Sequence, residues 1–288
     1  MNILRADHLG MCFGVRDAIA LAKSEAARRP VTVLGDLVHN TTVVDDLRGR
    51  GVRFERRTEA LSTPTVMITA HGASDRLLAE VRGRGHTVVE ATCPLVHHAH
   101  RSLAALVRDG FHPVVIGQRG HVEVRGLTED HPGCEVILSE GDLETIVPRP
   151  RFGVVSQTTQ PVARVRAMVA ALRARFPDSE VVVRDTVCQP TKQRQQAAED
   201  LASRCDVVVV IGGTQSNNTL ELVATCARFC DRVHHVQTAA DLQEGWFDEA
   251  GTVGITAGTS TPDSIIDDIE EVLREFRDLG ARSEMAMA

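Results

Sequence analysis

Residues 188–216 read CQPTKQRQQAAEDLASRCDVVVVIGGTQS: a cysteine, a helical stretch, a strand and a glycine-rich loop, in that order. The continuous apolar run Val207–Ile211 is typical of a strand that is buried on both faces of a parallel sheet. The amphipathic stretch Gln193–Ser203 before it predicts a helix that covers such a sheet. A loop with Gly212-Gly213 and Ser216 follows at the end of the strand. This stretch predicts one step of an α/β fold.

The same step occurs three times along the chain. Cys12 and Cys93 each stand before a helix, a strand, a glycine and a loop that carries His39 or His121. In the third copy Ser216 takes the place of the histidine, and the separations from the cysteine are 27, 28 and 28 residues. The strands of the three copies are Val31–Leu34, Val114–Ile116 and Val207–Ile211. Any α/β protein repeats strand and helix, but a cysteine at the same step of each copy indicates an internal repeat.

The second half of each copy also follows one plan. It has a middle strand, a short acid–leucine segment, and a third strand that ends in a small polar loop (69–72, 156–159 or 256–260). In the first two copies a fourth strand, Thr87–Glu90 or Val181–Arg184, leads to the next cysteine. The third copy has only the helical stretch Pro262–Leu279 at this point. We therefore expect the N-terminal strand Asn2–Arg5 to complete the third sheet.

These patterns predict an α/β protein of three pseudo-threefold-related units, each with a small, mainly parallel sheet, around a central site. The predicted domains are 14–93, 94–184, and 1–13 together with 185–279, followed by a C-terminal tail at 280–288. Ligands of parallel sheets bind at the carboxyl ends of the strands. The cysteine loops and the strand-end loops are therefore expected to converge.

Composition excludes several other classes of protein. The chain of 288 residues has 32 basic and 39 acidic residues, a net charge of −7, which argues against a nucleic-acid partner. The N-terminus does not have the pattern of a signal peptide, and no apolar run approaches the roughly 20 residues that span a bilayer. We therefore expect a cytoplasmic protein with no membrane partner. Seven cysteines, an odd number, fit thiols or metal ligands better than a disulfide framework.

Cys12, Cys93 and Cys188 are the three cysteines of the repeated step and predict one shared metal site. Three protein ligands leave one coordination position open, which is typical of a site that binds substrate. Zinc at such a site would polarise a water molecule, whereas a [4Fe–4S] cluster would leave one iron open and could deliver electrons. Spacing alone does not distinguish the two. Of the other cysteines, Cys226 and Cys230 are expected from their spacing to share a helix face, which suits a metal or buried packing, and their apolar neighbours favour packing.

The strand-end loops predict an anion site. Most of their donors stand where a helix begins, and helix N-termini carry unpaired N–H groups and a partial positive charge that suit phosphate. Taken singly, Ser, Thr and Asn at these positions are also ordinary helix caps. Glu123 follows His121 by two residues, and in an extended segment both side chains would face the same side. Glu123 is then either a proton relay or a surface glutamate. The donors are His39, His71, His121, Thr158, Ser216, Asn217, Asn218 and Ser260.

These motifs resemble the 4-hydroxy-3-methylbut-2-enyl diphosphate reductase family (LytB/IspH), in order and over nearly the whole chain. The matching stretches are Cys12–Val15, Gly35–Asn40, Ala70–Gly72, Ala91–Val96, Gly120–Glu123, Ser156–Thr159, Thr186–Cys188, Ser216–Thr219 and Thr256–Ser260.

The resemblance implies a [4Fe–4S] cluster on Cys12, Cys93 and Cys188 with one open iron. It implies that His39, His71, His121, Ser216, Asn218 and Ser260 hold a diphosphate. Asn217, in the same loop, can also donate a hydrogen bond to that group. The reaction implied is reductive dehydroxylation to isopentenyl and dimethylallyl diphosphates. Glu123 would deliver protons, Thr158 would orient the substrate hydroxyl, and a ferredoxin or flavodoxin would supply electrons.

The sequence departs from the family pattern at a few positions. Asn217 stands where a serine or small residue is usual, and Leu220-Glu221-Leu222 lacks the common basic residue. His97-His98 replaces a polar–basic pair. These departures leave open a paralogue that acts on another allylic diphosphate. A zinc hydrolase or lyase on the same cysteines and a non-catalytic iron–sulfur sensor also stay open.

Overall fold

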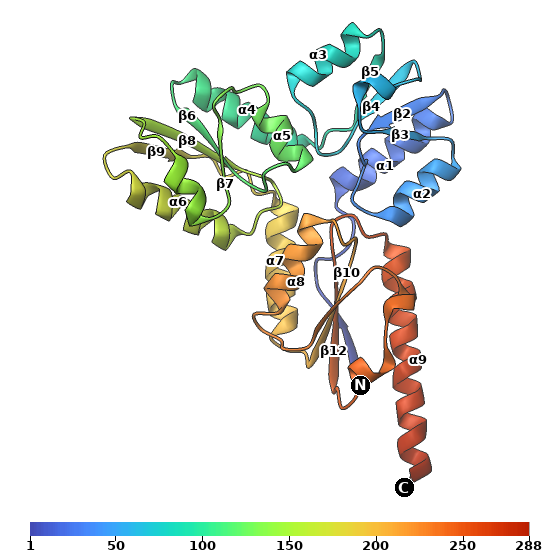
Figure 1. Cartoon of the computed structure of the whole chain (residues 1–288). Helices are drawn as coiled ribbons and strands as arrows, with labels where there is room; N and C mark the ends of the chain where they lie inside the picture. Colours follow the sequence, from blue (N-terminus) through green and yellow to red (C-terminus); the bar gives the residue numbers. More distant parts are fainter. Residues whose placement is uncertain (288) are drawn as a thin grey trace. The chain divides into compact units, whose positions relative to one another are not determined.

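A computed structural model describes the backbone of residues 1–287 and the side chains of residues 1–279 (Figure 1). The chain divides into two compact units. The smaller unit comprises Met1–Cys12, His39–Val43 and the chain from Gln189 onward, and the larger unit comprises Phe13–Val38 and Val44–Cys188. Within the described residues, no helix is both long and apolar enough to cross a membrane.

Three four-stranded sheets, all parallel, form the framework (Figure 1). In spatial order, the first sheet is β3 (Arg53–Glu55), β2 (Val31–Leu34), β4 (Thr65–Ile68) and β5 (Thr87–Glu90). The second is β7 (Glu135–Ile137), β6 (His112–Ile116), β8 (Arg151–Ser156) and β9 (Glu180–Val183). The third is β11 (Val233–Val236), β10 (Val207–Ile211), β12 (Thr252–Ala257) and β1 (Asn2–Arg5).

All three sheets have the same strand order. In each, the strand that follows the cysteine helix is central, with the third strand of the copy beside it. The second strand along the chain, called the middle strand above, is at one edge of the sheet, and the fourth strand is at the other edge. The edge strand of the third sheet is β1, which pairs in parallel with β12, from Asn2 opposite Thr252 to Arg5 opposite Ile255. The predicted α/β class with three small parallel sheets is therefore confirmed. The domain limits and the arrangement of the units around a common centre stay predictions.

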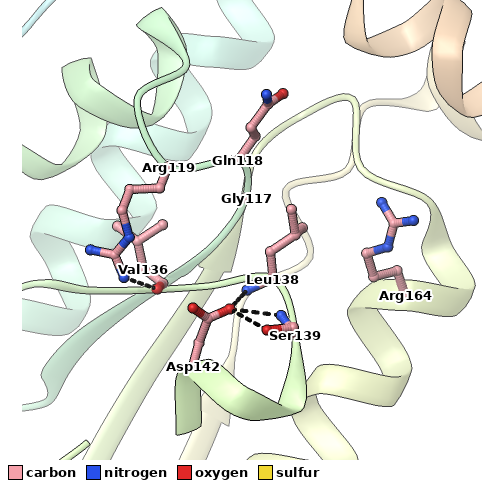
Figure 2. Close-up of a pocket in the computed structure, with 8 residues that line it drawn as sticks. All are labelled: Gly117, Gln118, Arg119, Val136, Leu138, Ser139, Asp142 and Arg164. Carbon is pink, nitrogen blue, oxygen red and sulfur yellow. Dashed lines mark hydrogen bonds between the residues drawn. The ribbon is translucent and has the colours of Figure 1, made fainter. Parts of the chain in front are cut away.

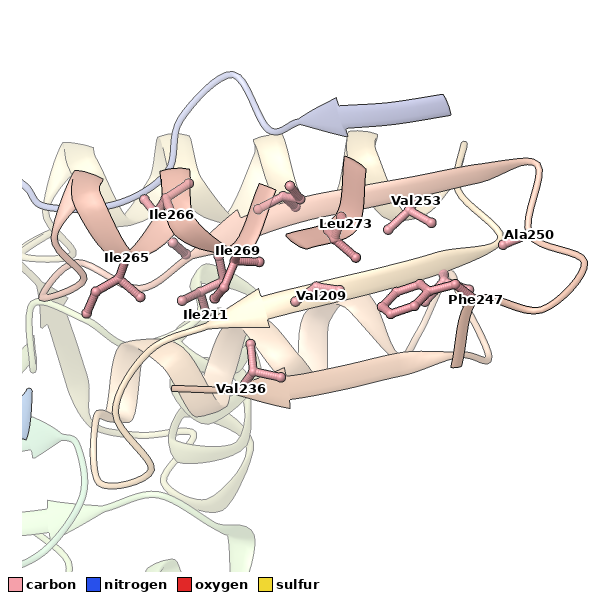
Figure 3. Packing of buried hydrophobic residues seen from close by; sticks show 13 residues of the cluster. Val209, Ile211, Val236, Phe247, Ala250, Val253, Ile265, Ile266, Ile269 and Leu273 are labelled. Atoms are coloured by element: carbon pink, nitrogen blue, oxygen red, sulfur yellow. The ribbon is translucent and has the colours of Figure 1, made fainter. Parts of the chain in front are cut away.

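The core of the third sheet explains why β10 is a run of β-branched residues. Val207, Val209 and Ile211 pack on one face with α9 (Asp263–Met287), whose Ile265, Ile266, Ile269 and Leu273 recur at helical spacing (Figure 3). Val208 and Val210 pack on the opposite face, against α7 (Gln189–Ala202) and α8 (Asn217–Cys226). Alternate residues of a strand point to opposite faces, so a strand covered on both sides must be apolar throughout.

The remaining helices precede or connect the strands of the first two sheets, and they lie in the larger unit except for the first residues of α2. They are α1 (Phe13–Ala26), α2 (Thr41–Gly49), α3 (Asp75–Gly83), α4 (Pro94–Arg108), α5 (Val122–Thr128) and α6 (Val162–Arg175). The last helix, α9, continues beyond the predicted end at residue 279 to Met287. Residue 288 of the predicted tail lies outside the described residues, as do the side chains from residue 280 onward.

The acid–leucine segments are short 3₁₀ turns, η1 (Thr58–Ala60), η2 (Glu140–Thr145) and η3 (Ala239–Asp241). Two of them begin with the same capping box, Ser139 with Asp142 in η2 and Thr238 with Asp241 in η3. In each box the aspartate accepts hydrogen bonds from two backbone N–H groups of its own segment. These local caps end the middle strand of the second and third sheets. A further 3₁₀ turn, η4 (Glu244–Phe247), precedes β12.

Candidate active site

The predicted site residues lie in the loops that follow the carboxyl ends of the two inner strands of each sheet. In the first two sheets the chain continues from the central strand to one edge of the sheet and from the third strand to the other edge, and such switch points form crevices at the carboxyl ends of strands. The third sheet has the same strand order, with β1 at the second edge. The loops at these ends carry His39, His121 and Ser216 after β2, β6 and β10. They carry His71, Thr158 and Ser260 after β4, β8 and β12.

Each of the three cysteines stands directly before a helix and is held by the same backbone hydrogen bond. The N–H of Cys12 donates to the carbonyl of Thr259 at 3.3 Å. Those of Cys93 and Cys188 donate to Ala70 at 3.0 Å and to Thr158 at 2.9 Å. In every case the acceptor lies in the loop that ends the third strand of a sheet. The equivalence of the three cysteines, inferred from spacing, thus extends to their backbone contacts.

The residues around these cysteines suit a metal ligand better than those around Cys134 and Cys226. All seven cysteines are free, and Cys12, Cys93 and Cys188 are half-buried. Gly14, in the first turn of α1, leaves room for Cys93, because a Cβ at residue 14 would lie 2.6 Å from its Sγ. By contrast, burial raises the pKa of Cys134 to about 12 and that of Cys226 to about 12. Such thiols are poor sources of the thiolate that binds metals.

His71 and His121 come together within the larger unit, with ring centroids 5.6 Å apart in an edge-to-face arrangement. His121 is the N-cap of α5, and its Nδ1 accepts the backbone N–H of Glu123 at 3.2 Å. A neutral imidazole with an accepting Nδ1 carries its proton on Nε2. The proton of the neutral His121 ring is therefore on Nε2.

Glu123 contacts Thr158 rather than sharing a face with His121. Its Oε1 accepts the backbone N–H of Thr158 at 2.6 Å, and its Oε2 accepts the Thr158 hydroxyl at 3.0 Å. The premise of an extended segment at residues 121–123 is wrong, because α5 already begins at Val122. The helical turn directs the side chain of Glu123 inward, where only 1% of the residue is exposed. The alternative of a surface glutamate is excluded.

Burial controls the ionisation of Glu123. Removal from water raises the pKa of its carboxyl group to about 7, although the two hydrogen bonds from Thr158 lower it. A carboxyl group with this pKa is protonated in about half of the molecules at neutral pH, which suits a general acid. Perturbed acids of this kind are typical of functional sites.

The smaller unit brings together the other predicted donors. The Ser260 hydroxyl donates to the carbonyl of His39 at 3.2 Å, and the Asn218 Oδ1 accepts the backbone N–H of Thr259 at 2.9 Å. That bond leaves the amide N–H₂ of Asn218 for a ligand. Ser216 is the N-cap of α8, where its Oγ accepts the N–H of Thr219, and Asn217 is the first residue of the helix.

Sequence reasoning missed two supporting residues. Gln157 is fully buried, and its Oε1 accepts from the N–H of Gln118 at 3.1 Å and from the Gln160 amide at 3.1 Å, which holds the loop before Thr158. Arg194 is buried on α7 and donates two hydrogen bonds to the carbonyl of Gly10, at 2.6 and 3.1 Å. For Gln157, the position directly before Thr158 was a usable signal. For Arg194, no local pattern marked the contact.

A pocket of about 510 Å³ lies beside the loop after β6 but contains no predicted site residue (Figure 2). Arg119 and Arg164 stand on opposite sides of it. The Arg119 guanidinium donates to the carbonyl of Val136. Asp142, which also lines the pocket, accepts the backbone N–H of Leu138. The pocket is on the β7 side of β6, whereas His121 and Thr158 belong to the β6 and β8 ends. It is therefore separate from the switch point.

Comparison with known families agrees with this fold and these loops. The family model described as "LytB protein" matches residues 3–274, which is nearly the whole chain. The chain belongs to the LytB family. The three cysteines and the strand-end loops described above all lie within the part that matches the LytB model.

Curated LytB relatives align over almost their full lengths. A protein from Citrifermentans bemidjiense is 39% identical over 273 residues, which cover 93% of this chain and 95% of the relative. One from Geobacter sulfurreducens is 35% identical over 278 residues, with 96% and 98% covered. Both are named 4-hydroxy-3-methylbut-2-enyl diphosphate reductase.

Solved structures of the same kind match the fold. The reductase described as the terminal enzyme of the non-mevalonate pathway has a TM-score of 0.69 and 33% identity, with 96% of this chain and 100% of that chain covered. The reductase from Plasmodium falciparum has a TM-score of 0.87, with 95% and 87% covered. Its 23% identity supports the fold alone.

Proposed function

We propose that this chain is an oxidoreductase that removes the hydroxyl group of 4-hydroxy-3-methylbut-2-enyl diphosphate. The C–O bond breaks, two electrons and two protons enter, and water leaves with isopentenyl or dimethylallyl diphosphate. The observation that carries this proposal is the full-length similarity to reductases of that name, at 39% identity over 93% of the chain.

The polar loops support the binding of a diphosphate. In the larger unit, the paired rings of His71 and His121 offer a donor through the Nε2–H of His121. In the smaller unit, Asn218 and the cap of α8 offer an amide and a helix N-terminus. We assign to diphosphate binding His39, His71, His121, Ser216, Asn217, Asn218 and Ser260. Ser260 must rotate away from the carbonyl of His39 before its hydroxyl can donate to a ligand.

Glu123 and Thr158 are assigned to proton delivery. In protonated Glu123, Oε1 still accepts the Thr158 N–H, so the proton belongs on Oε2, which then donates to the Thr158 oxygen. The hydroxyl proton of Thr158 is thereby released to orient and protonate the substrate hydroxyl. A pKa of about 7 for Glu123 keeps this donor available at neutral pH.

Cys12, Cys93 and Cys188 are assigned to a [4Fe–4S] cluster with one iron that has no protein ligand. Their matching backbone contacts and the space that Gly14 leaves at Cys93 fit such ligands. When bound, the cluster would supply the two electrons. We propose a ferredoxin or flavodoxin as the electron donor. A cytoplasmic location, where thiols stay reduced, is part of the same proposal.

Turnover by anaerobically purified protein tests the proposal. The full-length chain, with dithionite and a viologen as the source of electrons, should convert the hydroxylated diphosphate to the two isoprenoid diphosphates. Their identity and ratio are read by chromatography against standards. Iron-loaded protein that forms neither product but reduces another allylic diphosphate would assign the chain to a paralogous activity.

A further inference from the structure

Residues Ala73–Arg76 contact the end of α5 through a set of hydrogen bonds within the larger unit. The buried hydroxyl of Ser74 donates to Oε2 of Glu129 at 2.8 Å. The carboxylate of Asp130 accepts the backbone N–H of Asp75 at 2.7 Å and that of Arg76 at 3.0 Å. These bonds join the connection between β4 and β5 of the first sheet to the connection between β6 and β7 of the second sheet. The bonded residues are 54 or 55 positions apart in the chain.

Asp130 serves as a cap for a helix of another sheet. The first N–H groups of a helix have no partner inside it, and the helix start carries a partial positive charge. At α3 the Ser74 Oγ accepts the N–H of Leu77 at 3.1 Å, and the two preceding N–H groups bind Asp130. Hydrogen bonds to an ionised carboxylate are stronger than neutral ones. Asp130 therefore fixes the start of α3.

Glu129 holds the other side of the contact. It is the C-cap of α5, and its Oε1 accepts the Arg125 guanidinium at 3.2 Å while Oε2 accepts Ser74. One turn earlier, Gly126 lies close to the backbone of Ala73, since a Cβ at residue 126 would be in ordinary van der Waals contact with the Ala73 Cα, at 3.5 Å. The segment before α3 thus contacts the C-terminal half of α5 and the two residues that follow it.

His71 and His121 stand at the opposite end of these two segments. His71 precedes Ser74 by three residues, and His121 caps α5, a helix of seven residues. Their ring centroids are 5.6 Å apart. We propose that Glu129 and Asp130 are positioning residues that set the separation of the two histidines and so the affinity for the diphosphate group. This inference rests on the proposed function, in which both histidines bind that group.

A comparison of two aspartates tests the inference. Asp130→Asn removes the charge and one of two accepting oxygens, because the amide N–H₂ cannot accept. Asp142→Asn is the control for the loss of an aspartate charge, since Oδ2 of Asp142 accepts two backbone N–H groups within its own segment (Figure 2). Both variants are measured as full-length, anaerobically purified protein for KM, kcat, thermal midpoint and the Kd for inorganic diphosphate.

We expect both variants to lower the thermal midpoint, and only Asp130→Asn to weaken binding. Its KM and its Kd for inorganic diphosphate should rise together, by about tenfold, with kcat within about twofold of the wild type. Asp130→Glu keeps both carboxylate oxygens and should recover most of the affinity. Equal KM values and equal Kd values for Asp130→Asn and Asp142→Asn would overturn the inference.

The outcomes for the inference and for the proposed function are distinct. If wild-type protein shows no turnover, the proposed function fails, and the Kd for inorganic diphosphate still decides whether Asp130 positions an anion site. If Asp130→Asn lowers kcat alone and leaves both KM and Kd unchanged, the positioning role fails while the reductase stands. Wild-type protein that neither turns over nor binds inorganic diphosphate would overturn both.

Discussion

Both carboxylate oxygens of Glu123 accept hydrogen bonds from a single residue, Thr158, which donates its backbone N–H at 2.6 Å and its hydroxyl at 3.0 Å. Glu123 lies in the first turn of α5, and Thr158 follows the end of β8. The pairing fixes the orientation of a buried carboxyl group whose pKa is raised to about 7. In the proposed reaction, proton transfer from this group is the step on which the chain's own residues would act most directly.

Replacing Glu123 with glutamine should separate chemistry from binding. Glutamine keeps the size of the side chain and one acceptor but has no proton to deliver, and a lost general acid typically costs about 10² to 10⁴ in rate. We expect kcat to fall by at least about a hundredfold, with the Kd for inorganic diphosphate within about twofold of wild type. Retained turnover would remove the role of Glu123 as the acid.

The raised pKa of Glu123 also predicts how stability depends on pH. The folded protein holds this proton up to about pH 7, whereas an ordinary glutamate releases it near 4.5. Between these values the folded state binds more protons than the unfolded state, so the free energy of unfolding falls as the pH rises. The loss amounts to about 3 kcal/mol when complete.

Denaturant unfolding from pH 4 to pH 8 measures this effect. Because other groups also titrate, the quantity to compare is the difference between wild type and Glu123→Gln. The free energy of unfolding of the wild type, relative to that of the variant, should fall progressively as the pH rises from about 4.5 to 7 and then level off. A difference that does not change with pH would show that the carboxyl group has an ordinary pKa.

Thr158→Val should move the pH profile of turnover. In the wild type, the hydrogen bond from the Thr158 hydroxyl to Oε2 lowers the pKa of Glu123. The substitution removes this bond and leaves the backbone bond to Oε1 in place. The pKa of Glu123 should therefore rise, and the alkaline limb of the kcat profile should shift to higher pH while kcat itself falls. Thr158→Ser keeps the hydroxyl, and its pH profile should match that of the wild type.

Gly14→Ala should weaken the retention of iron. A Cβ at residue 14 would lie 2.6 Å from the Sγ of Cys93, a distance at which something must shift. Gly83→Ala is the control, since a Cβ there meets nothing within 4 Å. In helices alanine is more favourable than glycine by about 1 kcal/mol, so the control should be neutral or more stable. Equal iron content in the two variants would count against Cys93 as a ligand that needs this space.

The fold could be predicted because its strands are strongly patterned. The run Val207–Ile211 is buried on both faces and coincides with β10, and the pairing of β1 with β12 followed from a missing fourth strand. Short α5 was harder, since seven residues with a glycine give little periodicity and its N-cap is a histidine. As a result, the direction predicted from the sequence for the side chain of Glu123 was wrong. The contact between Asp130 and α3 spans 54 to 55 positions and left no local signal.

Metal and sulfide analysis tests the central claim most directly. The full-length chain, purified without oxygen, should contain about four irons and about four acid-labile sulfides per chain. Cys12→Ala, Cys93→Ala and Cys188→Ala should each lose most of this content, whereas Cys226→Ala should keep it. About one zinc per chain with no labile sulfide would contradict the iron–sulfur reductase and favour a zinc enzyme on the same three cysteines.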